Sequence, residues 1–321
     1  MLIDWDIPFN IGIRVLLNSY CNYNCFFCHN EGELKAKKDI IFTPKEFKKI
    51  LLTFKRLGSH SVAFSGGEPL LFPLFKEYLE IVVKIFQANN IYITTNGSLI
   101  DKHIEFLKKN KIKKIYISLH SLSPLNYKAL TSVNNLSKIK KNIKLLLKNN
   151  IRVVINMIML KGINFKTKEL EKMFNFCEKN NIRLNLLRVF NRRGRGKYYV
   201  NCKEIRNKMK QLGFKEIIPV KLDIFPFTRF QRRNLEVHLR DFSPVPIDSK
   251  LCLKCPYRVD CSEGYYYPRI TTRGFLKPCL WRNDLSLDLK KSLKDDTLLI
   301  DIKRFFKNFN RKDQPWKRVD N

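Results

Sequence analysis

The stretch IGIRVLLNSYCNYNCFFC (11–28) decides the fold, because it leads a short apolar strand directly into three cysteines. IGIRVLL (11–17) has the aliphatic and β-branched residues of a buried strand. Cys21, Cys25 and Cys28 follow it on one loop, with three and then two residues between them. Three thiolates in this arrangement can hold a [4Fe–4S] cluster and leave one iron without a protein ligand. An iron of that kind is open to a chelating substrate or cofactor.

A zinc site is the alternative for the same loop. Structural zinc takes four ligands, and His29, directly after Cys28, would complete such a set. The loop alone therefore predicts a metal site without fixing the metal.

The nine cysteines also bear on the cellular compartment. No apolar run is long enough to span a bilayer, and residues 1–10 carry two aspartates where a signal peptide would be basic. We expect a cytoplasmic protein, in which clustered cysteines bind metals more often than they form disulfides. Cys177 stands alone in an expected helix and is interpreted as a small buried apolar residue.

The charge of the chain is strongly positive. Lys and Arg number 62 against 29 Asp and Glu, which gives a formal net charge of +33. Such a field attracts anions, so nucleic acid, a phosphorylated substrate or an acidic protein are all compatible partners. A lysine-rich surface without a specific partner is the other interpretation. The basic clusters at 192–197 and 229–233 do not alternate with aromatic residues as RNA-binding motifs do.

Outward from the cysteine loop, short β-branched runs alternate with amphipathic segments as far as residue 190. We expect strands at 11–17, 61–64, 91–94, 114–119, 152–159 and 183–189, and helices at about 43–54, 72–88, 99–109, 134–149 and 167–180. This alternation predicts an α/β fold with parallel strands, a partial (β/α)6 TIM-like barrel over residues 1–190. In residues 191–321 strands and helices no longer alternate regularly, and we expect these residues to form a separate C-terminal domain that carries an auxiliary cluster.

Three further motifs lie at the ends of expected strands. They are Ser65–Pro69 (SGGEP), Thr94–Gly97 (TTNG) and Ser118–Ser121 (SLHS). Each alone is typical of a turn, but parallel strands bring their carboxyl ends together, so the motifs and the cysteine loop predict one site. The paired glycines of SGGEP let backbone atoms approach a ligand closely.

A second cysteine group lies in the C-terminal region. Its members are Cys252, Cys255, Cys261 and Cys279. Four thiolates suit a [4Fe–4S] cluster and a structural zinc ion equally well. Beside the first cysteine loop, we favour an auxiliary iron–sulfur cluster.

The whole constellation over residues 11–190 resembles the radical S-adenosylmethionine (SAM) superfamily. The resemblance implies that Cys21, Cys25 and Cys28 hold a [4Fe–4S] cluster whose open iron binds the amino and carboxylate groups of SAM. It implies reductive cleavage of SAM to a 5′-deoxyadenosyl radical, with an electron donor such as flavodoxin or ferredoxin. It also implies two sets of cofactor contacts: backbone at Gly66, Gly67 and Glu68 for the methionyl amine, and Thr95, Ser118 and Asn156 for the ribose and carboxylate.

Within the superfamily, the chain resembles the GTP 3′,8-cyclases of molybdenum cofactor biosynthesis. The resemblance lies in Cys21–Gly32, Ile115–Tyr127 and Thr271–Leu280. It implies that Arg14 and Arg269 face the substrate, since they match two substrate-binding arginines of that family.

Several positions depart from the cyclase pattern. Ser61 and Ala63 stand where that family has basic residues, Val154 replaces a lysine, and Tyr267 replaces an arginine. The Gly-Gly end of the family is also missing. Cys261 would close the open iron of the family's auxiliary cluster, which makes this region more similar to SPASM and Twitch enzymes.

The sequence hypothesis is a radical SAM enzyme with an auxiliary [4Fe–4S] cluster, acting on an anionic small-molecule or peptidic substrate. GTP 3′,8-cyclisation is the alternative within the same class. A basic nucleic-acid-binding protein with structural clusters is the alternative from another class.

Overall fold

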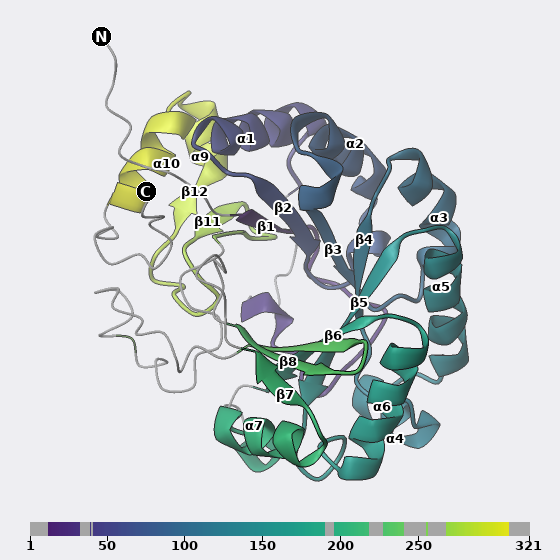
Figure 1. Cartoon of the computed structure of the whole chain (residues 1–321). Coiled ribbons are helices and arrows are strands. Elements are labelled where there is room, and N and C mark those ends of the chain that lie inside the picture. Colours follow the sequence, from purple (N-terminus) through teal and green to yellow (C-terminus); the bar gives the residue numbers. More distant parts are fainter. Residues whose placement is uncertain are drawn as a thin grey trace.

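The computed structural model describes residues 12–32, 39, 41–189, 196–217, 227–240, 255 and 268–307. Its described strands form one sheet, in the order β12-β11-β10-β1-β2-β3-β4-β5-β6-β9-β8-β7. The sheet is strongly curved, with the helices on its outer side (Figure 1).

Six parallel strands make up the centre of this sheet. They are β1 (Gly12–Leu16), β2 (Ser61–Ser65), β3 (Ile91–Thr95), β4 (Lys114–Ser118), β5 (Arg152–Met159) and β6 (Arg183–Arg188). Each of the first five pairs in parallel with the strand that follows it in the sequence. The predicted α/β alternation with parallel pairing is therefore confirmed.

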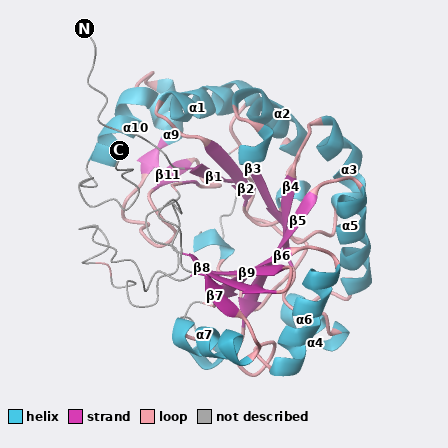
Figure 2. Ribbon diagram, in the orientation of Figure 1, coloured by secondary structure: helices cyan, strands magenta, loops and turns pink. Residues whose placement is uncertain are grey.

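Helices connect the parallel strands and cover the outer face of the sheet (Figure 2). They are α1 (Pro44–Arg56), α2 (Phe75–Ile85), α3 (Ile100–Lys109), α4 (Pro124–Thr131), α5 (Leu136–Lys148) and α6 (Thr167–Lys179). The Thr43 cap and its reciprocal bond with Glu46 form as the sequence predicts. Helix α4 was not expected, and it begins at a Ser123 cap followed by a proline. Short 3₁₀ turns add η1 (Asn30–Gly32), η2 (Pro69–Leu71), η3 (Ala88–Asn90) and η4 (Gly196–Tyr198).

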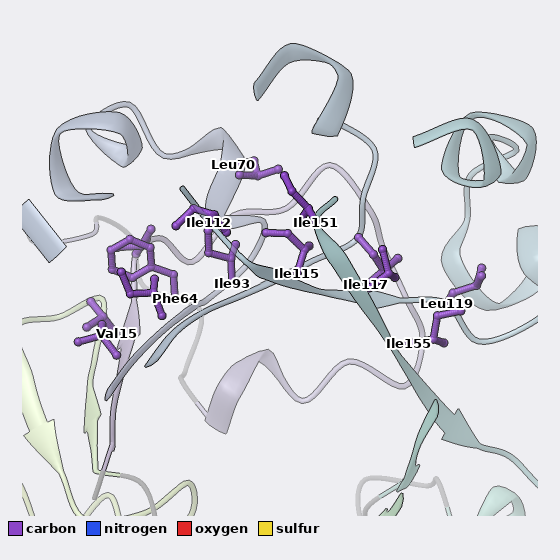
Figure 3. Packing of buried hydrophobic residues seen from close by; sticks show 14 of the residues in the cluster. Val15, Phe64, Leu70, Ile93, Ile112, Ile115, Ile117, Leu119, Ile151 and Ile155 are labelled. Carbon is purple, nitrogen blue, oxygen red and sulfur yellow. The ribbon is translucent and has the colours of Figure 1, made fainter. Parts of the chain in front are cut away.

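The core lies between the sheet and the helices (Figure 3). Alternate strand residues point into it, as with Ile91 and Ile93 in β3 and Ile115 and Ile117 in β4, all no more than 1% exposed. Each such side chain contributes roughly 1.5–3 kcal/mol through burial. The residues between them face the barrel interior, where the sequence places the site.

The C-terminal part of the chain extends the sheet at both edges. At one edge lie β9 (Leu235–Arg240), β8 (Phe227–Arg232) and β7 (Lys215–Ile217), with α7 (Cys202–Gln211) beside them. At the other edge, β10 (Arg269–Ile270) pairs in parallel with β1 and is followed by β11 (Phe275–Lys277) and β12 (Leu287–Asp288). Helices α9 (Leu289–Lys294) and α10 (Leu298–Lys307) end the described chain near α1. The division at residue 190 stays a prediction.

Several sequence predictions fall outside the described residues. They concern Cys252, Cys261, Tyr267, the basic residues at 192–195 and the chain end at 317–321. None of the described helices is long and apolar enough to cross a bilayer.

Candidate active site

The cysteine loop is joined along its first half to the SGGEP motif. It leaves the carboxyl end of β1, and the motif leaves the carboxyl end of the neighbouring β2. Three backbone hydrogen bonds join the segments: Leu17 N to Ser65 O (2.9 Å), Gly67 N to Asn18 O (2.8 Å) and Glu68 N to Tyr20 O (2.9 Å). The Asn18 side chain adds a bond to the carbonyl of Glu68 at 2.9 Å.

The two glycines of the motif are needed for this contact. A Cβ atom on Gly67 would lie 1.8 Å from the carbonyl oxygen of Tyr20, and one on Gly66 would lie 2.5 Å from that of Asn18. Gly66 also has a φ of +128°, which side chains rarely allow. The close approach that the glycines permit is therefore to the chain's own cysteine loop. Their contact with the methionyl amine stays a prediction.

The TTNG motif holds the loop from the next strand. The Asn96 side-chain amide donates to Asn22 Oδ1 at 2.8 Å and to Cys21 Sγ at 3.8 Å. Asn22 in turn donates to the Ser98 hydroxyl at 3.0 Å. These bonds fix the first cysteine against the end of β3.

Glu68 joins the two motifs in the interior. Its buried carboxylate accepts hydrogen bonds from Thr95 Oγ1 (2.6 Å), Asn96 N (2.8 Å) and Leu70 N (3.1 Å). Burial raises the pKa of Glu68 to about 7, against the opposing effect of these three donors. The Thr95 hydroxyl predicted to touch SAM is thus bonded to Glu68, and its role toward the cofactor stays a prediction.

The SLHS motif and helix α4 hold the second half of the loop. The Phe27 ring packs edge-on against His120, with ring centroids 4.8 Å apart. Burial lowers the pKa of His120 to about 4, and its Nδ1 accepts a hydrogen bond from Ile158 N. His120 is therefore neutral and acts as a packing surface. The Tyr23 hydroxyl bonds both Tyr127 of α4 and Asn135.

The three thiols lie near enough to influence one another. Burial, followed by the charges of Cys28 and Cys21, raises the pKa of the Cys25 thiol to about 12. Backbone N–H groups point at the sulfurs, from Tyr23 to Cys21 (3.4 Å) and from Asn30 to Cys28 (3.3 Å). Such donors suit thiolates that ligate an iron–sulfur cluster, and a bound metal would replace their protons.

In the part of the chain that the structure describes, no group of three or more histidine, cysteine, aspartate or glutamate side chains is arranged to hold a metal ion. The anchored loop, its N–H donors and the three neighbouring thiols nevertheless fit a three-cysteine cluster.

Three polar side chains, one each from β4, β5 and β6, lie in a row across the sheet. Ser118 lies beside Asn156 in the parallel register, and Asn156 lies beside Asn185. The Asn185 amide donates to Asn156 Oδ1 at 2.9 Å, and its own buried oxygen has no partner among the described residues. The structure brings the predicted Ser118 and Asn156 together. Asn185 was missed, although it ends the same row of inward-facing strand positions.

Arg14 and Arg269 are also brought together, because β1 and β10 pair with these two residues in register. A largely buried carboxylate that the sequence motifs do not include, Glu31, lies between them with its side chain 12% exposed. Its oxygens are 3.2 and 3.3 Å from Arg14 Nη1 and 3.5 Å from Arg269 Nε. Burial alone would raise the pKa of Glu31, but the two guanidinium groups hold it well below its usual range.

A second group of cations lines the interior near the amino ends of β4 to β6. Lys114 and Arg152 are in register, and Arg183 donates to the Tyr116 hydroxyl at 3.4 Å. Burial of the Lys114 ammonium group lowers its pKa to about 8, and the positive charges of Arg183 and Arg152 add to this effect. The buried Nε of Arg183 has no hydrogen-bond partner among the described residues. Like the side-chain oxygen of Asn185, this nitrogen is a buried polar atom that a ligand could hydrogen-bond.

The described part of the second cysteine group lies near the first cysteine loop. Cys255 and Cys279 lie within electrostatic reach of each other, and Arg269 acts on Cys279. The Trp281 ring, two residues after Cys279, lies 6.4 Å from the His29 ring of the first loop. Cys252 and Cys261 lie outside the described residues.

The Radical SAM superfamily profile matches residues 15–177, which include the cysteine loop and all three strand-end motifs. The chain therefore belongs to the radical SAM superfamily and is an enzyme. Members of this family use SAM and a [4Fe–4S] cluster, and the three-cysteine loop is where this chain would hold that cluster.

Within the superfamily, the chain is similar in sequence to proteins named as GTP 3′,8-cyclases. A probable GTP 3′,8-cyclase of Pyrococcus horikoshii is 29% identical over 307 residues, 92% of each chain. A GTP 3′,8-cyclase of Clostridium botulinum strain Okra is 28% identical over 90% of this chain and 86% of its own.

Solved structures share the fold. Streptococcus suis SuiB bound to S-adenosylmethionine matches with a TM-score of 0.64 at 20% identity, over 90% of this chain and 65% of SuiB. The chain thus spans about two thirds of SuiB. Native anSMEcpe with bound AdoMet matches with a TM-score of 0.62 at 16% identity, over 94% of this chain and 82% of that protein.

Substituting Gly67→Ala tests the contact that positions the loop. Because the new Cβ would overlap the Tyr20 carbonyl, we expect a loss of about 2–3 kcal/mol in unfolding free energy and loss of bound iron. Gly162→Ala is the control, since Gly162 has a φ of +78° but no atom within 4 Å. This control variant should lose about 1 kcal/mol of unfolding free energy and keep its bound iron. Full iron retention in Gly67→Ala would contradict the assignment.

Substituting Glu68→Gln tests the buried carboxylate. Glutamine cannot accept all three hydrogen bonds, so unfolding free energy should fall by about 1–3 kcal/mol. Because the folded pKa is raised to about 7, wild-type Glu68 favours the folded state at low pH and loses that contribution as pH rises through 7. Urea denaturation should show a larger wild-type advantage at about pH 5 than at about pH 8. An advantage that grows with pH would refute the raised pKa.

Proposed function

We propose that this enzyme binds a [4Fe–4S] cluster through Cys21, Cys25 and Cys28 and uses SAM to abstract a hydrogen from an anionic small-molecule or peptidic substrate. Held beside that cluster, SAM would supply radical hydrogen abstraction after one-electron reduction. The observation that carries the proposal is the loop itself, which each of the three strand-end motifs helps to anchor.

The chain's own residues would orient the cofactor within the barrel. Ser118, Asn156 and Asn185 present a hydroxyl and two amides in one row across three adjacent strands. The free oxygen of Asn185 can accept a hydrogen bond from a ribose hydroxyl. Gly66–Glu68 and Thr95 would form the opposite wall, beside the cysteine loop.

The interior charge supports an anionic substrate. Lys114, Arg152 and Arg183 make no ion pair within the described ranges, and Arg14 and Arg269 share one carboxylate. Cations in a partly buried interior attract anions strongly because water screens them less there. The Arg183 Nε atom is the clearest donor for such a ligand.

GTP 3′,8-cyclisation is the second candidate, and the curated relatives favour it. The sequence departures at Ser61, Ala63 and Val154 remove cations from the cyclase pattern. Arg152 lies two residues before Val154 on the same face of β5, and Arg183 on β6 is in register with Val154. These cations offer a phosphate group contacts that the missing lysine would otherwise make.

The second cysteine group would hold an auxiliary [4Fe–4S] cluster through Cys252, Cys255, Cys261 and Cys279. The proximity of Cys255 to Cys279 supports this part of the proposal. A flavodoxin or ferredoxin would supply the electron. The net charge of +33 would also allow nucleic acid as a partner.

Iron content and SAM cleavage test the proposal together. Anaerobically reconstituted wild type should bind about eight irons and release 5′-deoxyadenosine after dithionite reduction. A Cys21/Cys25/Cys28 triple alanine variant should bind about four irons and release none. Equal deoxyadenosine formation by both proteins would contradict the cluster assignment.

Substrate dependence separates the two candidates. If the substrate is GTP, GTP and not ATP should stimulate deoxyadenosine formation, and Arg183→Ala should raise KM for GTP about tenfold or more, because a charged contact is worth about 1.5–3 kcal/mol. Lys179→Ala, an exposed residue at the end of α6, is the control. Deoxyadenosine formation that is indifferent to GTP would exclude the cyclase and leave another anion as substrate.

A further inference from the structure

The anion site formed by Arg14 and Arg269 is already filled from within the chain. The Glu31 carboxylate contacts both guanidinium groups and accepts a hydrogen bond from the Ser65 hydroxyl at 2.6 Å. Two guanidinium groups and one hydroxyl around two oxygens are the contacts that a phosphate or carboxylate ligand would use.

The arginines require a negative partner in the folded protein. Arg269 is 1% exposed, and it lies beside Arg14 in the register of β1 and β10. Arg14 is partly exposed, but a cation beside the buried Arg269 repels it strongly unless an anion lies between them. Either Glu31 or an arriving oxyanion can fill that role.

The occupying carboxylate comes from the end of the cysteine loop. Glu31 lies in η1, three residues after Cys28. Asn30 and Glu31 both have positive φ, at 49° and 50°, which is uncommon for residues with side chains. Such backbone persists where side-chain contacts hold it, and the contacts here are those of Glu31 with the arginines.

We propose that Glu31 is an internal anion that occupies the Arg14–Arg269 site until an oxyanion group of the substrate displaces it. The inference rests on the proposed function only in taking the substrate to be an anion. Displacement would free η1 from its positive-φ conformation. Because η1 begins two residues after Cys28, the arrival of the substrate would then change the conformation of the loop that holds the cluster.

Triphosphate affinity tests this competition. Inorganic triphosphate is titrated calorimetrically into anaerobically reconstituted wild type, Glu31→Gln and Glu105→Gln at fixed low salt. Glutamine keeps the shape of Glu31 but removes the competing charge, so Glu31→Gln should bind triphosphate about tenfold tighter. Glu105 is an exposed surface residue paired with Lys108. Its substitution makes the same change in net charge and should alter the affinity less than about twofold.

A second substitution keeps the test valid if Glu31→Gln does not fold. Glu31→Asp keeps the charge but shortens the side chain, so it should fold, retain iron and bind triphosphate about threefold tighter than wild type. A merely structural role for Glu31 predicts weaker binding in both variants.

The outcomes separate this inference from the proposed function. Wild-type binding that Arg14→Ala abolishes, combined with equal or weaker binding by both Glu31 variants, would overturn the internal anion and keep the anion site. Absence of triphosphate binding in wild type and in both Glu31 variants would overturn the internal anion and the anionic substrate together.

Discussion

The backbone contact between residues 17–20 and Ser65–Glu68 is the constraint on which the rest of the site depends. It fixes where the chain leaves β1 and therefore where Cys21 begins the loop. A side chain on either glycine of the motif would overlap the backbone of that loop. The later anchors at Asn96 and Phe27 act on a loop whose starting position this contact has already set.

Charge is the second organising feature of the interior. Positively charged side chains lie on the inner face at β10 and β1, and again at β4, β5 and β6. Glu31 neutralises part of the pair at β1 and β10, and Glu236 lies near Arg183. A barrel with this balance favours an anion in its interior, which links the high net charge of the chain to its site.

Much of the fold could be predicted from the sequence because strand and helix periods alternate regularly up to residue 190. The six strands and the capped start of α1 follow from that pattern alone. Helix α4 could not, since it is short and only weakly amphipathic. Strand β10 is only two residues long, and its pairing with β1 joins residues 255 positions apart (269 − 14).

The site was predictable where chemistry is local in sequence. The spacing of the three cysteines predicts a cluster, and the strand-end motifs predict where it lies. Glu31, Asn185 and the Lys114–Arg152–Arg183 group could not be found in this way, because their meaning depends on neighbours in other strands. The glycines of SGGEP were expected to approach a ligand, and the structure shows that they approach the cysteine loop.

The central claim is that the anchored loop holds a cluster with one iron open to SAM. Electron paramagnetic resonance of a reduced Cys255→Ala/Cys279→Ala variant isolates that cluster from the second cysteine group. The account predicts a [4Fe–4S]⁺ signal whose g-values shift when SAM is added, because SAM would bind the open iron. A signal that SAM leaves unchanged, or the absence of any cluster signal in this variant, would contradict it.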